Sequence, residues 1–541
     1  MTAAAVVQPV GTQPAWRTSF ESGWWEHRWL LAAVAALMAV PLLWPDVPPL
    51  TDLPGHIGRY RVQLELDGSP ALQRFYEFEW ALIGNLGIDL LVMPLAPLLG
   101  LEPAVKLIVA AIPVLTAAGA ILVAREVHGR VPPTAFFALP LAYNHAFLFG
   151  FVNFALSMAL GLLALGLWLR LDRLGELRTR ALLFVPLSML LWLVHVFGWG
   201  TLGAAAFSAE VVRAWDRRAR GLAAPWRAGL RCLPLAPPVV LMLLWRSGAS
   251  GGTGDFFDWD SKLVWLATLL RDRWMVWDVL SLSAMVGLLA VTMVSGRLQF
   301  SRNLIASAAF LFLLFLLMPR ILLGSAYADM RLAPYALLIA ILAIRLRPDA
   351  GGRLAGALAL GGLLFLGARV AGNTWSAVQY DRLYDRELAA LRHVPTGARL
   401  VSLVGRHCGE NWAKPRTEHL PALALARRRA FSNDQWVMPG AQLLRVRYEE
   451  GAPFTVDPSQ IVTEAQCKTD AWLPIDTALG TIPRRAFDYL WLIEPPIYDP
   501  ALVAGLQPLW RSGRSVLFRI PPQRSSATSD TPTGSDTRPT R

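Results

Sequence analysis

The sequence has little charge and lacks the common nucleotide and metal motifs. Only 17% of its 541 residues are charged and 54% are hydrophobic, which excludes an ordinary soluble globular protein. It contains no G-x-x-x-x-G-K-[ST] phosphate loop, no H-E-x-x-H zinc motif, no C-x-x-C pair and no dinucleotide fingerprint after a predicted strand. Because the predicted inner loops are also short, intracellular chemistry with ATP or a soluble nucleotide sugar has no evident place.

Cysteine is scarce as well, with three residues in the chain. Cys232 falls at a predicted inner membrane boundary, whereas Cys408 and Cys467 fall in a domain that we predict outside. An oxidising compartment permits these two to form a disulfide, and the alternative is a pair of unrelated buried thiols. A cleavable signal peptide is not indicated either. The first apolar run is followed by PDVPPL instead of an A-x-A-like site, so we expect it to remain as an anchor.

Apolar runs separated by short loops occupy most of the chain up to residue 371. A membrane-spanning helix needs roughly 20 apolar residues, and fewer where Trp and Tyr lie in the interface. We therefore predict an all-α polytopic membrane domain with about eleven transmembrane helices. The predicted spans are 29–44, 104–124, 132–149, 152–169, 181–197, 199–213, 232–245, 276–294, 304–318, 333–346 and 354–371.

Arginine indicates how these spans are oriented. If residues 1–28 form a cytoplasmic N-terminus, the inner loops are rich in arginine, as in RAWDRRAR at 213–220, and poor in acidic residues. The outer loops are acid-rich by contrast, so the positive-inside rule places the C-terminal domain in the periplasm or extracellular space. The same distribution accounts for the net charge of +12 and argues against nucleic acid as a partner.

The segment at 80–101 does not fit this scheme directly. WALIGNLGIDLLVMPLAPLLGL is apolar enough to span, but it contains Asp89 and the helix breakers Gly84, Gly87 and Pro94. We interpret it as lying in the outer interface, within a first outer loop at 45–103. If it spanned, every later loop would change sides and RAWDRRAR would lie outside, which the arginine distribution opposes.

Residues 373–520 differ from the membrane domain at 29–372 and predict a small soluble α/β domain. TWSAVQYDRLYDRELAALRHV has helical periodicity, whereas RLVSLV (399–404), FDYLWLI (487–493) and SVLFRI (515–520) are typical of strands. Residues 521–541 are polar and rich in Pro, Ser and Thr, so we expect a disordered tail.

Polar side chains near the span ends gather on the predicted outer side. Polar groups are costly at membrane depth, so their convergence suggests a cavity with a function. The group contains Asp46, Asp52, His56 and Arg59 around LTDLPGHIGRY; Asn144, His145 and Asn153 in YNHAFLFGFVNF; His195 in LVHVFGWG; Asp255, Asp258, Asp260 and Lys262 in GDFFDWDSK; and Arg320, Tyr327, Asp329 and Arg331 in PRILLGSAYADMR.

These residues also have structural interpretations. Asp52 followed by Pro54 is typical of a helix N-cap, and capping does not exclude catalysis. A helix over 53–66 places His56 and Arg59 on roughly the face of Asp52, although His56 could instead satisfy a core carbonyl. The asparagines and histidines of the outer turns, Asn144, His145, Asn153 and His195, could likewise serve loop hydrogen bonding alone.

The remaining charged loops leave two alternatives open. Arg320 and Arg331 lie at opposite ends of one short loop and could bind a phosphate together, or they could be snorkelling anchors. GDFFDWDSK offers carboxylates to a divalent cation, but Asp-rich loops are usually solvated turns. We assign no metal ligand and no cofactor, while a divalent cation remains possible.

The pattern resembles a family, the polytopic GT-C type glycosyltransferases, which use polyprenyl-phosphate sugars at the outer membrane face. This family includes the protein mannosyltransferases and aminoarabinose transferases. The resemblance is carried by one N-terminal span, the acid of LTDLPGHIGRY just outside it, an interfacial segment, a membrane domain of about this size and a soluble outer C-terminal domain. In that family the acid of the first outer loop is the proposed general base. The resemblance therefore implies Asp52 as the base, with Asp46 as the second choice.

The chain departs from the family pattern at two places. Many members have an Asp-Glu pair where this chain has Asp52 and then His56, so His56 is a second catalytic candidate. A further acidic position found in many relatives is replaced here by Asn144, His145 and Asn153. Both departures leave open which group takes the proton.

The resemblance implies an enzyme of the hexosyl- or pentosyl-transferase class in the inner (plasma) membrane. It would move a sugar, with inversion, from a polyprenyl-phosphate donor to a hydroxyl of a lipid, glycan or protein acceptor. A membrane transporter and a non-catalytic assembly or scaffold protein remain alternatives, because polar residues also mark permeation paths. The expected substrate contacts are Asp46, Arg59, Asn144, His145, Asn153, His195, Arg320, Tyr327, Asp329 and Arg331.

Overall fold

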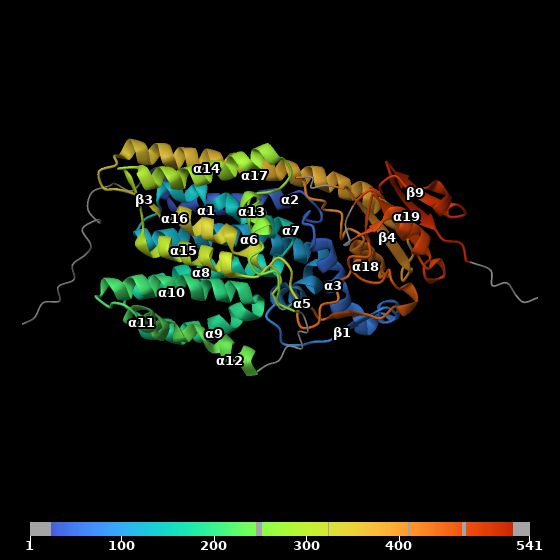
Figure 1. Ribbon diagram of the computed structural model, residues 1–541, viewed down its shortest axis with the longest axis horizontal. Coiled ribbons are helices and arrows are strands. Elements are labelled where there is room, and N and C mark those ends of the chain that lie inside the picture. Colours follow the sequence, from blue (N-terminus) through green and yellow to red (C-terminus); the bar gives the residue numbers. More distant parts are fainter. Residues whose placement is uncertain (1–22, 245–251, 323, 409–411, 468–471, 523–541) are drawn as a thin grey trace, which may run out of the picture.

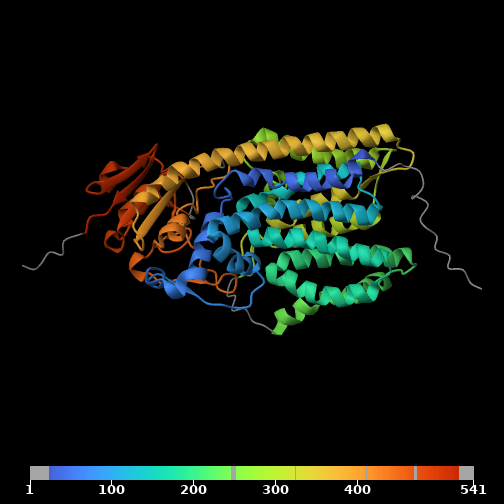
Figure 2. The same cartoon turned by 180° about the vertical axis from the view of Figure 1, so that it is seen from behind.

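The computed structural model describes residues 23–244, 252–322, 324–408, 412–467 and 472–522. Most of the predicted N-terminal segment 1–28, the end of the predicted span 232–245 and nearly all of the predicted tail 521–541 lie outside the described residues. A helical bundle forms one end of the molecule and a β-sheet forms the other (Figure 1). The long helix α17 runs beside the bundle and continues to the sheet (Figure 2).

Helices dominate the bundle. Apolar residues predominate along the long helices, so these helices have a broad surface for neighbouring helices or lipid. The helices are α1 Arg28–Leu37, α2 Val40–Leu43, α3 Leu53–Glu65, α4 Pro70–Gln73, α5 Gly87–Leu99, α6 Leu101–His128, α7 His145–Phe149, α8 Val152–Arg173, α9 Leu177–Val194, α10 Val196–Asp216, α11 Ala223–Cys232, α12 Pro237–Leu244, α13 Trp259–Ala267, α14 Met275–Val294, α15 Arg302–Leu317, α16 Ala333–Leu342, α17 Gly352–Leu388, α18 Ala422–Arg428 and α19 Ile475–Thr481.

The chain is a multi-pass membrane protein. Within the described residues, five helices (α6, α8, α9, α14 and α17 with its short extension) are long and apolar enough to cross a membrane. Shorter apolar helices, among them α1, α5 and α15, accompany them. The predicted number of eleven spans is not confirmed. Helix α5 covers part of the segment 80–101, and its place in the interface stays a prediction.

The predicted span at 132–149 is wrong as a single helix. Two 3₁₀ turns, Pro133–Phe137 and Leu139–Tyr143, are followed by the short helix α7. Proline lacks the backbone N–H that a helix interior needs, and Pro132, Pro133 and Pro140 recur through this stretch. The segment is nevertheless almost entirely buried, so an apolar run alone could not distinguish it from a spanning helix.

Small residues let the bundle helices approach closely. Helix α8 packs against both α6 and α10. At the α8–α10 contact, a Cβ atom on Gly198 would lie 2.4 Å from the carbonyl oxygen of Ser157. Small residues commonly permit this backbone approach between membrane helices, where packing replaces the hydrophobic effect as the source of association.

A six-stranded mixed sheet forms the core of the C-terminal domain, in the order β7-β6-β4-β8-β10-β9. The first four strands are parallel, and β10 pairs antiparallel with both β8 and β9. The predicted strands at 399–404, 487–493 and 515–520 are confirmed as β4, β8 and β10. The strands are β1 Tyr76–Phe78, β2 Leu298–Phe300, β3 Ile344–Leu346, β4 Leu400–Arg406, β5 Leu444–Val446, β6 Ile461–Thr463, β7 Leu473–Pro474, β8 Tyr489–Ile493, β9 Gln507–Ser512 and β10 Ser515–Arg519.

The first outer loop is built into this C-terminal domain. Strand β1 of the loop pairs antiparallel with β5, and α3 packs against α18. Val62, Leu72 and Phe75 of the loop share one buried hydrophobic cluster with Val401 and Leu492 of the sheet. Residues of the first outer loop and residues beyond 400 are therefore held in fixed register. The domain bounds at 372 and 373 stay a prediction.

A disulfide joins two segments at the edge of the sheet. Cys408 follows β4 and Cys467 follows β6, and their Cα atoms lie 5.3 Å apart. Cys232, at the end of α11, is a free thiol. Of the two alternatives left open by the sequence, the structure has the disulfide.

Candidate functional site

Asp52 lies at the N-cap position of α3, but its side chain makes no capping hydrogen bond. Its backbone N–H instead donates to the carbonyl oxygen of Phe149 at 2.9 Å. The neighbouring N–H of Thr51 donates to the carbonyl oxygen of Leu148 at 3.4 Å. The C-terminal end of α7 therefore positions Asp52 through the backbone. The carboxylate is left available for other contacts.

Gly150 completes this support. Its φ is +106°, a conformation that side chains other than glycine rarely adopt. A Cβ atom at residue 150 would lie 2.7 Å from the backbone nitrogen of Asp52 and 2.9 Å from its Cβ. The glycine in YNHAFLFGFVNF thus permits the close approach of the two loops.

Residues from the C-terminal domain surround the carboxylate of Asp52. Nε2 of His419 lies 3.9 Å from Oδ1 of Asp52 and 3.7 Å from Oδ1 of Asp457. The ring of His419 packs on Trp436, with centroids 4.3 Å apart. None of these residues of the C-terminal domain was predicted to belong to the site. In the sequence, the polar run AKPRTEH at 413–419 is the only local feature at this place. In the structure its charged side chains are buried, although charged side chains are normally exposed.

This environment changes the acidity of Asp52. Burial raises the pKa of its carboxyl to about 7, His419 opposes the rise, and the carboxylates of Glu418 and Asp457 add to it. The pKa of His419 is also raised, because the surrounding carboxylates, led by Asp457, outweigh the effect of burial. Two groups whose pKa values are both raised therefore lie side by side.

Two buried cations lie near Asp52. The ammonium of Lys414 lies 3.8 Å from the ring centroid of Phe149, and the guanidinium of Arg331 lies 4.5 Å from that of Phe151. The two rings are stacked on each other at 4.8 Å. Within the described part of the chain, no carboxylate lies at ion-pair distance from either cation. Arg331 has only weak polar contacts, to His195 at 3.5 Å and to a hydroxyl and a carbonyl of its own loop.

Both basic side chains are buried, so water does not solvate their charge. Lys414 is 5% exposed and Arg331 is 8% exposed. Burial lowers the pKa of Lys414 well below its ordinary value, and it lowers that of Arg331 to about 10 although Asp52 opposes the change. Buried charges are normally paired. A buried lysine and a buried arginine that have no carboxylate partner among the described residues are therefore suited to an anionic ligand, which would stabilise their charged forms.

His56 lies beside this group but makes different contacts. Its ring packs on Trp436 at 5.2 Å and stacks near Tyr60 at 6.2 Å. Burial, with help from Arg59 and His419, lowers its pKa well below the ordinary value. His56 is thus a neutral ring in the wall of the site, and its buried Nδ1 has no hydrogen-bond partner among the described residues.

Arg59 and Asn153 are held by one acidic residue. Arg59 forms a buried two-pronged ion pair with Asp89 of α5. The side-chain amide of Asn153 donates at 3.0 Å to Oδ2 of Asp89, which also accepts from Arg59, and the side-chain oxygen of Asn153 accepts from the backbone N–H of Ile88. These contacts join α3, α5 and α8. The charge of Arg59 is already compensated.

The other polar residues of the short turns also have local partners. Asn144 caps α7 by accepting from the N–H of Phe147 at 3.1 Å. Nδ1 of His195 accepts from the N–H of Phe197 at 3.2 Å, and its Nε2 faces Arg331. The ring of His145 packs on Phe149 and Trp265, next to the site.

The two ends of the loop from Arg320 to Arg331 lie in different surroundings. Arg320 forms a half-exposed ion pair with Asp255 at 3.5 Å, so the two arginines do not converge on one phosphate. Tyr327 packs on Phe149, and Asp329 forms a buried ion pair with Lys262 at 3.0 Å. Only Arg331 of this set keeps an uncompensated charge in the site.

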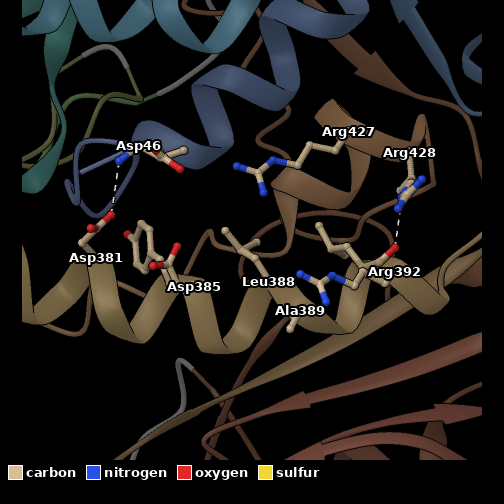
Figure 3. A pocket seen from close by; sticks show the side chains of 11 residues that line it. Asp46, Asp381, Asp385, Leu388, Ala389, Arg392, Arg427 and Arg428 are labelled. Carbon is tan, nitrogen blue, oxygen red and sulfur yellow. Dashed lines mark hydrogen bonds between the residues drawn. The ribbon is translucent and has the colours of Figure 1, made fainter. Parts of the chain in front are cut away.

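Asp46 lies in a separate cavity of about 260 Å³. Its backbone N–H donates to Asp381 of α17, and Asp385 lies one turn further along the same helix (Figure 3). Arg427 and Arg428 of α18 line the opposite side. Asp46 therefore does not share a wall with Asp52.

The aspartates of GDFFDWDSK do not gather around a common point. Asp258 caps α13 by accepting from the N–H of Ser261, and Asp255 faces Arg320. Across the ranges described by the structure, no three His, Cys, Asp or Glu side chains are arranged to hold a metal ion.

No protein-family model and no curated protein sequence matches the chain. Among solved structures, the chain is similar to the crystal structure of ArnT from Cupriavidus metallidurans bound to undecaprenyl phosphate. The two proteins are 12% identical, and the comparison covers 90% of this chain and 96% of that chain with a TM-score of 0.43. The functional proposal below rests on the geometry of the site.

Proposed function

We propose that the protein is a glycosyltransferase that moves a sugar from a polyprenyl-phosphate donor to an acceptor hydroxyl at the outer membrane face. One observation carries the proposal: a buried carboxylate with a pKa near neutrality lies beside two buried basic side chains for which the described ranges contain no carboxylate partner. Asp52 supplies the carboxylate, and Lys414 and Arg331 supply the cations. A reaction that removes a proton at one atom and releases a phosphate nearby needs this combination.

Asp52 acts as the general base. A base is most effective when its pKa lies near the working pH, and burial brings Asp52 into that range. Its carboxylate takes the proton of the acceptor hydroxyl, and the oxygen then forms a bond to the anomeric carbon. The bond between that carbon and the donor phosphate oxygen breaks on the opposite side, so the configuration inverts. The acceptor is a hydroxyl of a lipid, glycan or protein.

Lys414 and Arg331 bind the donor phosphate and stabilise the charge that grows on it as the sugar leaves. Preorganised cations in a site that excludes water are effective at this task, because they need no reorganisation during the reaction. The prenyl chain of the donor stays in the bilayer, next to the apolar helices beside the site. Positioning of both substrates at the membrane surface supplies a further part of the rate.

The remaining predicted residues shape the site without charge of their own. His56, His145 and Tyr327 present rings near Phe149 or Trp436 that can pack on a sugar. The orientation follows the arginine distribution, with the N-terminus in the cytoplasm and the site and the domain at 373–520 in the periplasm of an inner membrane.

The test is transfer by purified protein from a panel of radiolabelled polyprenyl-phosphate sugars. We expect transfer from one donor and its loss in Asp52→Asn. Asp67→Asn, an exposed carboxylate in the same outer loop, is the matched control and retains activity. Absence of transfer from every donor by folded wild-type protein overturns the proposal and favours a transporter or a scaffold protein. Full activity of Asp52→Asn overturns the role of Asp52.

A further inference from the structure

His419 lies between two carboxylates that differ in their access to solvent. Its side chain is 5% exposed, as against 11% for Asp52 on one side and 22% for Asp457 on the other. The same atom, Nε2, faces both carboxylates, at 3.9 Å and 3.7 Å. Each distance is about 1 Å beyond a hydrogen bond, so a small movement of the ring or one bridging water completes either contact.

The contacts of the ring define which nitrogen can carry a proton. Nδ1 lies 3.1 Å from the backbone carbonyl oxygen of Asp434. A carbonyl oxygen only accepts, so Nδ1 must hold the hydrogen and donate it. In the neutral ring Nε2 therefore has a free lone pair. Packing on Trp436 keeps this face directed at the two carboxylates.

We propose that His419 and Asp457 form a proton relay that returns Asp52 to its basic form after each transfer. The inference rests on the proposed function, in which Asp52 accepts a proton that must leave before the next cycle. It assigns a role to two residues of the C-terminal domain. The first outer loop would then be unable to sustain turnover without that domain.

The relay balances atom by atom. The acceptor hydroxyl gives its proton to Asp52 while its oxygen bonds to the anomeric carbon. The protonated carboxyl of Asp52 then gives this proton to the lone pair of Nε2, which makes an imidazolium. Nε2 passes the same proton to Oδ1 of Asp457, which releases it to solvent. No redox partner is needed, and all three side chains return to their starting charge.

The surroundings of His419 suit a transient imidazolium. Glu418 lies next to it in the chain and is paired with Arg406 at 2.6 Å. Gln460 donates to Oδ1 of Asp457 at 2.7 Å and holds that carboxylate in place. The titratable groups around the ring are Asp52 and His56 at the start of α3, Lys414 and Glu418 on its own segment, Asp434 after α18, and Asp457 before β6. Carboxylates predominate among them, which supports positive charge on the ring and raises its pKa.

Steady-state kinetics of His419→Gln test the relay. Glutamine can still donate to the carbonyl of Asp434 but cannot carry a proton, so we expect kcat to fall by about 10- to 100-fold with little change in KM. Asp457→Asn should lower kcat by a smaller factor in the same direction. His407→Gln replaces a half-exposed histidine of the same segment and should leave kcat unchanged.

Chemical rescue separates a proton carrier from a structural residue. We expect added imidazoles to restore part of the turnover of His419→Gly, with a rate that follows the pKa of the imidazole used. If His419→Gln keeps wild-type kcat, the relay is overturned. It is equally overturned if kcat falls, imidazoles do not rescue it and Asp457→Asn behaves as wild type, because His419 then serves structure alone.

An infrared pH titration makes the relay testable without turnover. The carboxylic-acid band that disappears in Asp52→Asn reports protonation of Asp52. In wild-type protein this band and a histidine ring band that His419→Gln removes should change together, as expected for coupled groups. If no assay shows transfer but the two bands change together, the proposed function is rejected and proton exchange between Asp52 and His419 is retained. Independent titration of the two bands would reject the relay.

Discussion

Gly150 and Asp52 are in direct backbone contact, since a Cβ atom on Gly150 would lie 2.7 Å from the backbone nitrogen of Asp52. The contact joins the loop after α7 to the start of α3. The position of the proposed base is therefore fixed by a residue that has no side chain.

Gly150→Ala should displace Asp52 and reduce transfer by about 10-fold or more, because a small misplacement of a catalytic group is costly. The positive φ adds about 1–3 kcal/mol of strain. Gly175→Ala is the matched control: it also has a positive φ, but no atom lies within 4 Å of its Cβ position. Transfer rates and thermal unfolding of both variants should be compared. Equal loss of activity in both would show that backbone strain, not the contact with Asp52, is responsible.

Activity should depend on the ionisation of Asp52. Burial raises its pKa to about 7, and a general base works only when deprotonated. We therefore expect kcat to rise with pH through about 7 and then to level off. Initial rates between about pH 5 and about pH 9 measure this profile. A kcat that stays constant from about pH 5 upwards would mean that a group with an ordinary carboxyl pKa, or none, takes the proton.

The same shift predicts that Asp52→Asn stabilises the protein at alkaline pH. A carboxyl whose folded-state pKa is raised holds its proton more tightly in the folded state, so stability is lost as pH rises from about 4 to about 7. The full cost above that range is about 4 kcal/mol. Thermal unfolding should show a higher midpoint for Asp52→Asn than for wild type at about pH 8, with the difference shrinking towards about pH 4. A variant that is less stable than wild type at alkaline pH would contradict the burial of a charged carboxylate.

The two uncompensated cations should be needed for the donor. Lys414→Gln and Arg331→Gln should each lower kcat/KM for the polyprenyl-phosphate sugar by about 100- to 1000-fold, as for other preorganised charge contacts. Arg320→Gln is the control, because Arg320 is paired with Asp255 near the surface and should change the rate little. If only Arg320→Gln affects the donor, the phosphate binds at the other end of this loop.

The sequence alone could indicate the loop of Asp52 as a candidate, because an acid and a proline directly after an apolar run are a local signal. Strands β4, β8 and β10 were likewise predictable from short runs of branched and aromatic residues. His419, Lys414 and Asp457 were not, because they meet Asp52 only through the pairing of β1 with β5 and of α3 with α18. Such long-range pairings leave no local pattern. Arg59 shows the converse: its position suggested a ligand contact, while its partner Asp89 lay in a segment whose place in the fold was open.

Helix α17 sets the geometry of the whole outer assembly. Its 37 residues correspond to about 55 Å, whereas the hydrocarbon core of a bilayer is about 30 Å thick. The helix therefore fixes both the distance of the sheet from the lipid and the rotation of the sheet about the helix axis. One inserted residue would turn everything beyond it by about 100°. Such a turn conflicts with the β1–β5 pairing and the α3–α18 packing that hold His419 beside Asp52.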